Sequence, residues 1–186
     1  MRRFLVFVVC IFLLTGCSKK SSELSSVISL REQLLSGNGC HFVTTITADY
    51  GTQLYTFQMD CTADSSGEIS FRVINPESIC DVTGKISANE GKLTFNDKAL
   101  LFDILADGQL TPVSAPMLLI KSLRSGYIKA CGHADNGLYV QIDDSYANDA
   151  IHLDIWTNSE NMPVRAEFLW KGKRILSMTV ENFTIL

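Results

Sequence analysis

The sequence has no apolar run long enough to cross a bilayer. Its uncharged N-terminal stretch, Phe4–Gly16, is well short of the about 20 residues that a transmembrane helix needs. The other apolar residues are scattered in short alternating runs. The sequence therefore predicts no transmembrane helix, and its 186 residues favour one domain with a sizeable core.

Groups for catalysis or metal binding are also scarce. The chain has three histidines, His41, His133 and His152, and none has a partner at the spacing of a metal site. Neither a Gly-Xaa-Ser-Xaa-Gly motif nor a phosphate-binding loop is present. We therefore expect no enzymatic activity and no cofactor.

Two short stretches come nearest to a chemical motif. Cys131-Gly132-His133 has a thiol beside an imidazole, but side chains so close in sequence rarely face each other. Asp143, Asp144 and Asp149 flank a loop without the residue pattern of a calcium site, so a solvated acidic loop is favoured.

Basic charge is low. Lys and Arg number 16 against 20 Asp and Glu, which gives a formal charge of −4. This balance argues against nucleic-acid binding and against electrostatic docking to membranes.

The start of the chain has the layout of a bacterial lipoprotein signal peptide. Arg2 and Arg3 precede a short apolar run that ends in Leu14-Thr15-Gly16-Cys17. A Leu-Xaa-Gly-Cys pattern resembles the processing site at which Cys receives a diacylglyceryl group and becomes the new N-terminus. The apolar stretch is too short for a plain membrane anchor, and an ordinary secretory signal peptide does not need a cysteine at its cleavage site.

We therefore predict a signal peptide over 1–16, a lipid anchor on Cys17, a polar tether over 17–22 and one domain over 23–186. Palmitate is an expected component of the anchor. Cleavage before Cys17 removes Arg2 and Arg3 and no acidic residue, which leaves 14 basic and 20 acidic residues and a formal charge of −6. The mature protein is expected at the extracytoplasmic face of the cell membrane.

A helix is predicted after the tether, with Ser22 as its N-cap and Gly37 at its end. Arg31 completes an otherwise apolar stripe at helical spacing. The apolar members of the stripe are Leu24, Val27, Ile28, Leu34 and Leu35. Packing on a sheet is favoured, with a membrane-surface helix as the alternative.

An antiparallel hairpin is predicted next, because the apolar period changes to two from Cys40. A two-residue turn at Tyr50-Gly51 would place Cys40 opposite Cys61. In this register the further pairs are Phe42 with Met59, Thr44 with Phe57, and Ile46 with Tyr55. Opposed residues are nearly close enough for a disulfide, so we predict Cys40–Cys61 and, from the remaining cysteines, Cys80–Cys131. The alternatives are a longer turn, which shifts the register, and reduced, buried cysteines.

More strands follow, interrupted once by a helix over 114–126. Pro116 suits its first turn and Gly126 its end. This helix is apolar on more than one side and should be deeply packed. The remainder alternates as strands, with a bulge predicted near Asn182.

This order resembles the LolA/LolB-like superfamily of lipoprotein-handling proteins. The resemblance is carried by the strand-then-Pro segment Phe71–Pro76, by Pro116-Met117-Leu118-Leu119 as a central helix, and by the closing strands 151–185. It implies a mainly β (α+β) fold, in which a curved antiparallel sheet forms an incomplete β-barrel. An N-terminal helix and a central helix lie on its concave side.

The resemblance also implies an apolar cavity between sheet and helices. Its expected lining residues are Phe42, Ile46, Tyr55, Phe57, Met59, Phe71, Val73, Met117, Leu118 and Leu119. A solid core made of the same residues is the alternative.

Two functional hypotheses follow, both non-catalytic. In the first, the anchored domain binds a lipid, an acyl chain or an apolar peptide in its concave face. In the second, a solid-core lipoprotein binds and supports a cell-envelope enzyme, as some related anchored spore germination lipoproteins support a cortex-cleaving amidase. Neither hypothesis involves nucleic acid.

Overall fold

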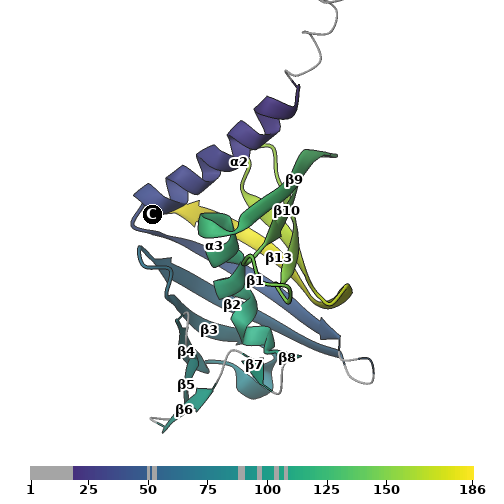
Figure 1. Cartoon of the computed structure of the whole chain (residues 1–186). Helices are drawn as coiled ribbons and strands as arrows, with labels where there is room; N and C mark the ends of the chain where they lie inside the picture. The colour runs from purple at the N-terminus through teal and green to yellow at the C-terminus, as the bar shows by residue number, and fades with distance from the viewer. Residues whose placement is uncertain are drawn as a thin grey trace, which may run out of the picture.

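The chain forms one large antiparallel sheet that curves around a helix (Figure 1). The computed structural model describes residues 19–49, 51, 54–87, 91–95, 98–102, 105–106 and 109–186. The predicted signal peptide, Cys17 and Tyr50 lie outside these residues. None of the described helices has the length and apolar character that a bilayer crossing requires.

The first half of the chain is a helix followed by a meander. Helix α2 spans Lys19–Ser36. The strands are β1 Gly39–Asp49, β2 Leu54–Asp64, β3 Ile69–Asn75, β4 Thr83–Ile86, β5 Gly91–Phe95 and β6 Lys98–Phe102. A 3-10 turn, η1 Glu77–Ile79, separates β3 from β4, because Pro76 ends the third strand as the sequence predicts.

The second half contains the central helix and a second meander. Strands β7 Leu105–Ala106 and β8 Gln109–Leu110 pair with each other, and the turn η2 Pro112–Ser114 leads into helix α3 Ala115–Ser125. The later strands are β9 Tyr127–Ala134, β10 Gly137–Asp143, β11 His152–Thr157, β12 Pro163–Trp170 and β13 Lys173–Ile185.

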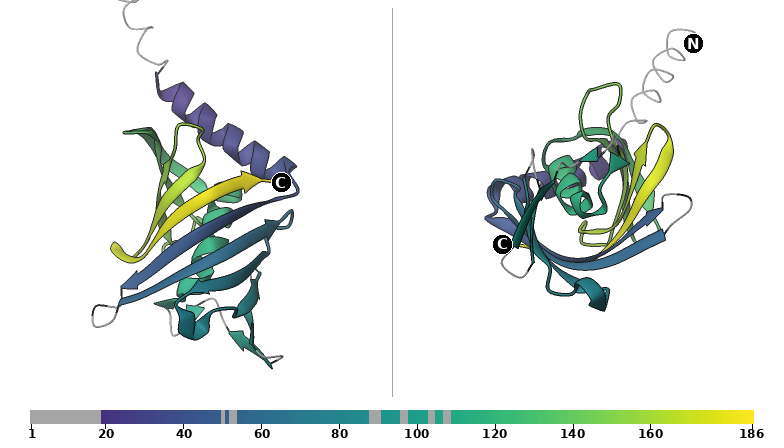
Figure 2. Two further views of the ribbon diagram at one scale, coloured as in Figure 1. Left: turned by 180° about the vertical axis from the view of Figure 1, so that it is seen from behind. Right: turned by 90° about the horizontal axis from the view of Figure 1, so that it is seen from below.

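The two meanders join at the middle of the sheet. The strand order is β6-β5-β4-β3-β2-β1-β13-β12-β11-β10-β9, so the first and last strands are neighbours and β6 and β9 are the two edges. Helix α3 connects these edges across the hollow of the sheet, as the right-hand view of Figure 2 shows. This open half-barrel, with α2 and α3 on its concave side, confirms the fold class that the resemblance implies.

A single hydrophobic core lies between the sheet and the helices. Along β1 every second residue is buried, and Phe42 and Ile46 have no exposed surface. The same alternation along β11 buries Leu153 and Ile155. Because the inward residues of both meanders belong to one core cluster with α2 and α3, the concave side is one packed unit.

The predicted register of the first hairpin is wrong by two residues. Strand β1 ends at Asp49 and β2 begins at Leu54, so four residues rather than two connect them. Cys40 therefore lies opposite Ala63, and Cys61 lies opposite Phe42. The predicted pairs shift together: Thr44 faces Met59, Ile46 faces Phe57 and Ala48 faces Tyr55. A shift of two keeps each side chain on its predicted face, because strand residues alternate with period two.

The predicted disulfides are absent from the structure, in which Cys40, Cys61, Cys80 and Cys131 are all thiols. The register separates the first pair along the hairpin. Cys80 precedes β4 and Cys131 lies in edge strand β9, and seven strands stand between these two in the sheet order. The alternative of reduced cysteines, buried at Cys40 and Cys61, agrees with this arrangement.

Burial should keep the thiols of Cys40 and Cys61 unreactive. Desolvation raises the pKa of Cys40 to about 12 and also raises that of Cys61, so neither is a thiolate at neutral pH. In the folded protein we expect iodoacetamide to modify the half-exposed Cys80 and to spare Cys61. Peptide mapping by mass spectrometry checks this, with urea-unfolded protein as the control in which both react. A disulfide-linked Cys40–Cys61 peptide would contradict the structure.

The N-terminal helix begins earlier than predicted. Residues 19–22, expected in a flexible tether, form the first turn of α2, and Ser22 lies inside the helix rather than at its N-cap. The predicted bulge near Asn182 is confirmed: the pairing of β1 with β13 shifts there, and Asn182 has a positive φ of 54°. The central helix also has nearly its predicted bounds.

Candidate functional site

Most of the residues expected to line a cavity are buried in the core. Each of the following has at most 4% of its surface exposed: Phe42, Ile46, Met59, Phe71, Val73, Met117, Leu118 and Leu119. The other two, Tyr55 and Phe57, lie toward the hairpin end of β2, with ring centroids 6.4 Å apart and nearly parallel. Tyr55 is 42% exposed and Phe57 is half-buried.

Helix α3 occupies the hollow of the half-barrel. Its run from Ala115 to Ile120 is entirely buried, as are Ser122 and Leu123. A surface helix buries only one stripe, so burial of this kind requires neighbours on several sides. Those neighbours are the two wings of the sheet and α2, all within the same core cluster. Each fully buried leucine or isoleucine stabilises such packing by about 1.5–3 kcal/mol.

Arg31 fastens α2 to the end of α3. Its Nε donates to the carbonyl of Leu123 at 2.7 Å, and Nη2 donates to the carbonyls of Gly126 at 2.8 Å and Ser122 at 3.4 Å. The last carbonyls of a helix have no partner inside it and carry partial negative charge, which suits a guanidinium. Burial lowers the pKa of Arg31, but an arginine stays charged at neutral pH.

A second arginine holds α3 from the opposite direction. Arg124 donates from Nη2 to the carbonyl of Ser65 at 2.6 Å, in the turn between β2 and β3. Asp64 organises that turn by accepting from the backbone N–H and the hydroxyl of Ser66, at 2.8 and 2.6 Å. The hydroxyl hydrogen bond lowers the pKa of Asp64. The C-terminal half of α3 is thus tied to both α2 and the sheet.

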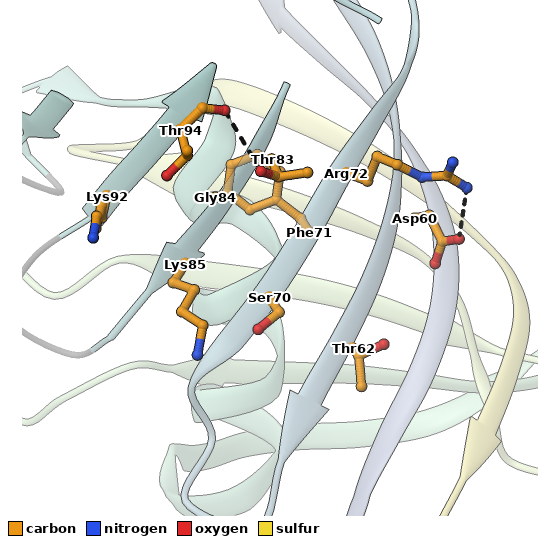
Figure 3. Close-up of a pocket in the computed structure, with 10 residues that line it drawn as sticks. All are labelled: Asp60, Thr62, Ser70, Phe71, Arg72, Thr83, Gly84, Lys85, Lys92 and Thr94. Carbon is orange, nitrogen blue, oxygen red and sulfur yellow. Dashed lines mark hydrogen bonds and ion pairs between the residues drawn. The ribbon is translucent and has the colours of Figure 1, made fainter. Parts of the chain in front are cut away.

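The opposite face of the sheet carries a polar groove of about 500 Å³ over β2 to β5 (Figure 3). Arg72 lies beside it, 3.7 Å from Asp60 and 3.8 Å from Asp81. The other polar side chains around the groove are Thr62, Ser70, Thr83, Lys85, Lys92 and Thr94. Hydroxyl and cationic donors of this kind suit an anionic or polyhydroxylated group.

A second polar cluster lies on the same outer face, over β10 and β11. His152 contacts two carboxylates, with Nδ1 2.7 Å from Asp143 and Nε2 3.2 Å from Asp154. Tyr139 donates its hydroxyl to Asp154 at 2.5 Å, and Gln141 donates to the Tyr139 oxygen at 2.8 Å. Every member is hydrogen-bonded to another, so the cluster links β10 to β11 on the outer face.

Tyr139 should titrate at unusually high pH. Desolvation, followed by the hydrogen bond to Asp154, raises its pKa to about 12. Stability from this group is complete below the pKa of an unfolded tyrosine, about 10, and is lost as the pH rises from there through 12. In an ultraviolet titration of tyrosinate we expect Tyr139→Phe to remove the component at highest pH. The control Tyr146→Phe removes an 85% exposed tyrosine and should leave that component in place.

The described residues contain no group of three or more His, Cys, Asp or Glu side chains arranged to hold a metal. The three histidines lie apart: His41 pairs with Asp60, His133 with Glu23, and His152 with the two aspartates named above.

The contact of Arg31 with α3 was not predicted from the sequence. The sequence signal for it is a charged residue in an apolar helical stripe, because such a residue needs polar partners when it is buried.

Comparisons with known proteins find similar chains among solved structures. No protein-family model matches the chain, and no curated protein sequence matches it. Among solved structures, an uncharacterized conserved protein from Thermus thermophilus is similar, with 11% identity, a TM-score of 0.49, and 88% of this chain and 87% of that one covered.

A LolA superfamily protein from Nitrosomonas europaea has 9% identity and a TM-score of 0.47, with 88% of this chain and 93% of that one covered. The Mycobacterium tuberculosis lipoprotein LppX has 11% identity and a TM-score of 0.43, with coverages of 89% and 96%. The fold of the chain is an open antiparallel half-barrel with a helix in its hollow.

Proposed function

We propose that this chain is a non-catalytic extracytoplasmic lipoprotein, anchored through Cys17, that binds and supports a cell-envelope enzyme through its surface. The observation that supports this most is the filled concave side. Eight of the ten residues that would line a ligand cavity are buried to 4% exposure or less in one cluster with α3.

Energetics also favour a solid core. An acyl ligand would have to displace Met117, Leu118 and Leu119, at about 1.5–3 kcal/mol for each large apolar side chain that loses its burial. An acyl chain that moves from the bilayer into the protein gains little free energy in return. It was already removed from water in the bilayer, and lipid tails are as apolar as leucine. The two arginine contacts at the end of α3 add to this resistance.

The second candidate is a carrier for an acyl chain or apolar peptide. It is favoured by the wall that β1, β2 and β3 present behind α3, in which the buried residues are apolar apart from Thr44. In this alternative α3 is a lid, and the ligand takes its place against Phe42, Ile46 and Met59.

Lipid analysis separates the two candidates. The processed protein is purified from membranes in a mild detergent, its bound lipids are extracted, and its covalent anchor is measured by mass spectrometry. We expect diacylglyceryl and palmitoyl groups on Cys17 and no other stoichiometric lipid. A stoichiometric non-covalent lipid would favour the carrier. A Cys17 without a lipid would contradict the anchor in both.

The enzyme partner is tested by co-expression with an envelope amidase of the same organism. We expect a complex on gel filtration and a higher amidase activity than the amidase shows alone. If the protein carries no non-covalent lipid and neither binds the amidase nor raises its activity, the proposal that it supports an amidase is wrong.

A further inference from the structure

Helix α2 has two apolar stripes, and only one of them is packed. Val27, Leu30 and Leu34 are 3–4% exposed and face the core. At 3.6 residues per turn, Leu24, Ile28 and Leu35 fall within a sector of about 40° that lies roughly 110° around the helix from the first stripe. These three side chains are 39%, 42% and 54% exposed. Single exposed leucines are ordinary, but an aligned row of exposed apolar side chains on one helix indicates a binding surface.

Basic residues occur near both ends of the helix. In the sequence, Lys19 and Lys20 are the first residues of α2. At the other end, Leu35 borders a groove of about 500 Å³ whose lining includes Met117, Lys121 and Arg124. Arg124 donates to carbonyl oxygens, which are neutral acceptors, and Lys121 is 3.5 Å from Asp144.

The position of the stripe relative to the anchor identifies what covers it. Helix α2 begins at Lys19, two residues after Cys17. Two extended residues reach at most about 7 Å, so an anchored Cys17 holds the start of α2 at the lipid headgroups. Figures 1 and 2 show α2 crossing one end of the half-barrel, and none of the described helices or strands covers its outer side.

We propose that α2 lies along the surface of an anionic bilayer, with Leu24, Ile28 and Leu35 inserted at the boundary between headgroups and acyl chains. This rests on the proposed lipid anchor. The attraction is apolar and local: the basic residues near the two ends of α2 favour anionic headgroups, while the acidic remainder of the domain is repelled. The half-barrel therefore has one fixed orientation on the membrane rather than turning freely on a leash.

The test places a tryptophan on either side of α2. The processed lipoprotein is reconstituted into phosphatidylglycerol-containing vesicles whose acyl chains are brominated near the headgroup. Ile28→Trp is compared with the matched control Ser29→Trp, an exposed position about 100° further round the helix. The native Trp156 and Trp170 are common to both proteins, so the difference reports the added tryptophan alone. Fluorescence quenching at Ile28→Trp should be at least about twice that at Ser29→Trp.

Equal quenching at the two positions would overturn the docking while leaving the anchor intact. The mass of the Cys17 peptide from the same sample checks the anchor, and an unmodified Cys17 would overturn the anchor and the docking with it. A second copy of the chain is the other candidate for covering the stripe. If sedimentation in detergent shows a dimer that Leu24→Ser/Leu35→Ser converts to a monomer, the stripe is a dimer interface and the membrane proposal is wrong.

Discussion

Replacing Leu119 by alanine is expected to lower the free energy of unfolding by about 2–5 kcal/mol. Leu119 has no exposed surface and lies at the centre of α3, between the wings of the sheet. The substitution removes buried methyl groups and leaves a cavity that rigid strands on both sides cannot fill. Urea denaturation followed by circular dichroism measures the change.

Lys121→Ala on the same helix is the matched control. Lys121 is exposed, and its partner Asp144 keeps a hydrogen bond from the Ile151 N–H, so loss of the ion pair should cost about 1 kcal/mol or less. A Leu119→Ala protein as stable as the control would mean that α3 separates readily from the sheet. That result would move the functional assignment toward an acyl carrier with α3 as its lid.

Arg31→Met is expected to lower the free energy of unfolding by about 2–4 kcal/mol. Methionine keeps much of the apolar stem but donates nothing to the carbonyls of Leu123 and Gly126, which now receive hydrogen bonds of 2.7 and 2.8 Å. A hydrogen bond from a charged donor contributes about 1.5–3 kcal/mol, so loss of the donor to these helix-end carbonyls is destabilising. Thermal unfolding and amide hydrogen exchange of α3 measure the loss.

Two variants sharpen this prediction. Arg31→Lys keeps the charge but has one nitrogen for two separate carbonyls, so it should recover only part of the stability. Arg72→Met removes an exposed arginine whose nearest carboxylates are 3.7 and 3.8 Å away, and it should cost less than about 1 kcal/mol. If Arg31→Met costs no more than Arg72→Met, Arg31 does not fasten α3.

The sequence was sufficient for the alternation of the strands and for the central helix. Side-chain parity along β1 and β2 depends only on period two, so it survived an incorrect register. The register depends on loop length, and the residues between the two strands suit either a two-residue or a four-residue loop. In the structure Asp49 accepts a hydrogen bond from the Gly51 N–H at 2.8 Å, a local contact that begins the longer loop.

The contents of the concave side could not be predicted in the same way. Met117, Leu118 and Leu119 are equally suitable for lining a cavity and for filling it, because both roles need apolar side chains on the same face. The choice depends on how closely the sheet curves around α3. It also depends on Arg31, whose partner Leu123 is 92 residues further along the chain. Contacts of that separation have no local sequence signal.

The pairing of β1 with β13 constrains the order in which the sheet can fold. Cys40 pairs with Ile185, so the first strand to be synthesised is completed only by the last. Until then β1 has one open edge, and the Asn38 N–H lacks the Leu186 carbonyl that it contacts at 2.8 Å in the finished fold. Contacts this distant in sequence are made slowly and late. Strand β13 must therefore be available before the core closes, and its loss would expose the middle of the sheet rather than its margin.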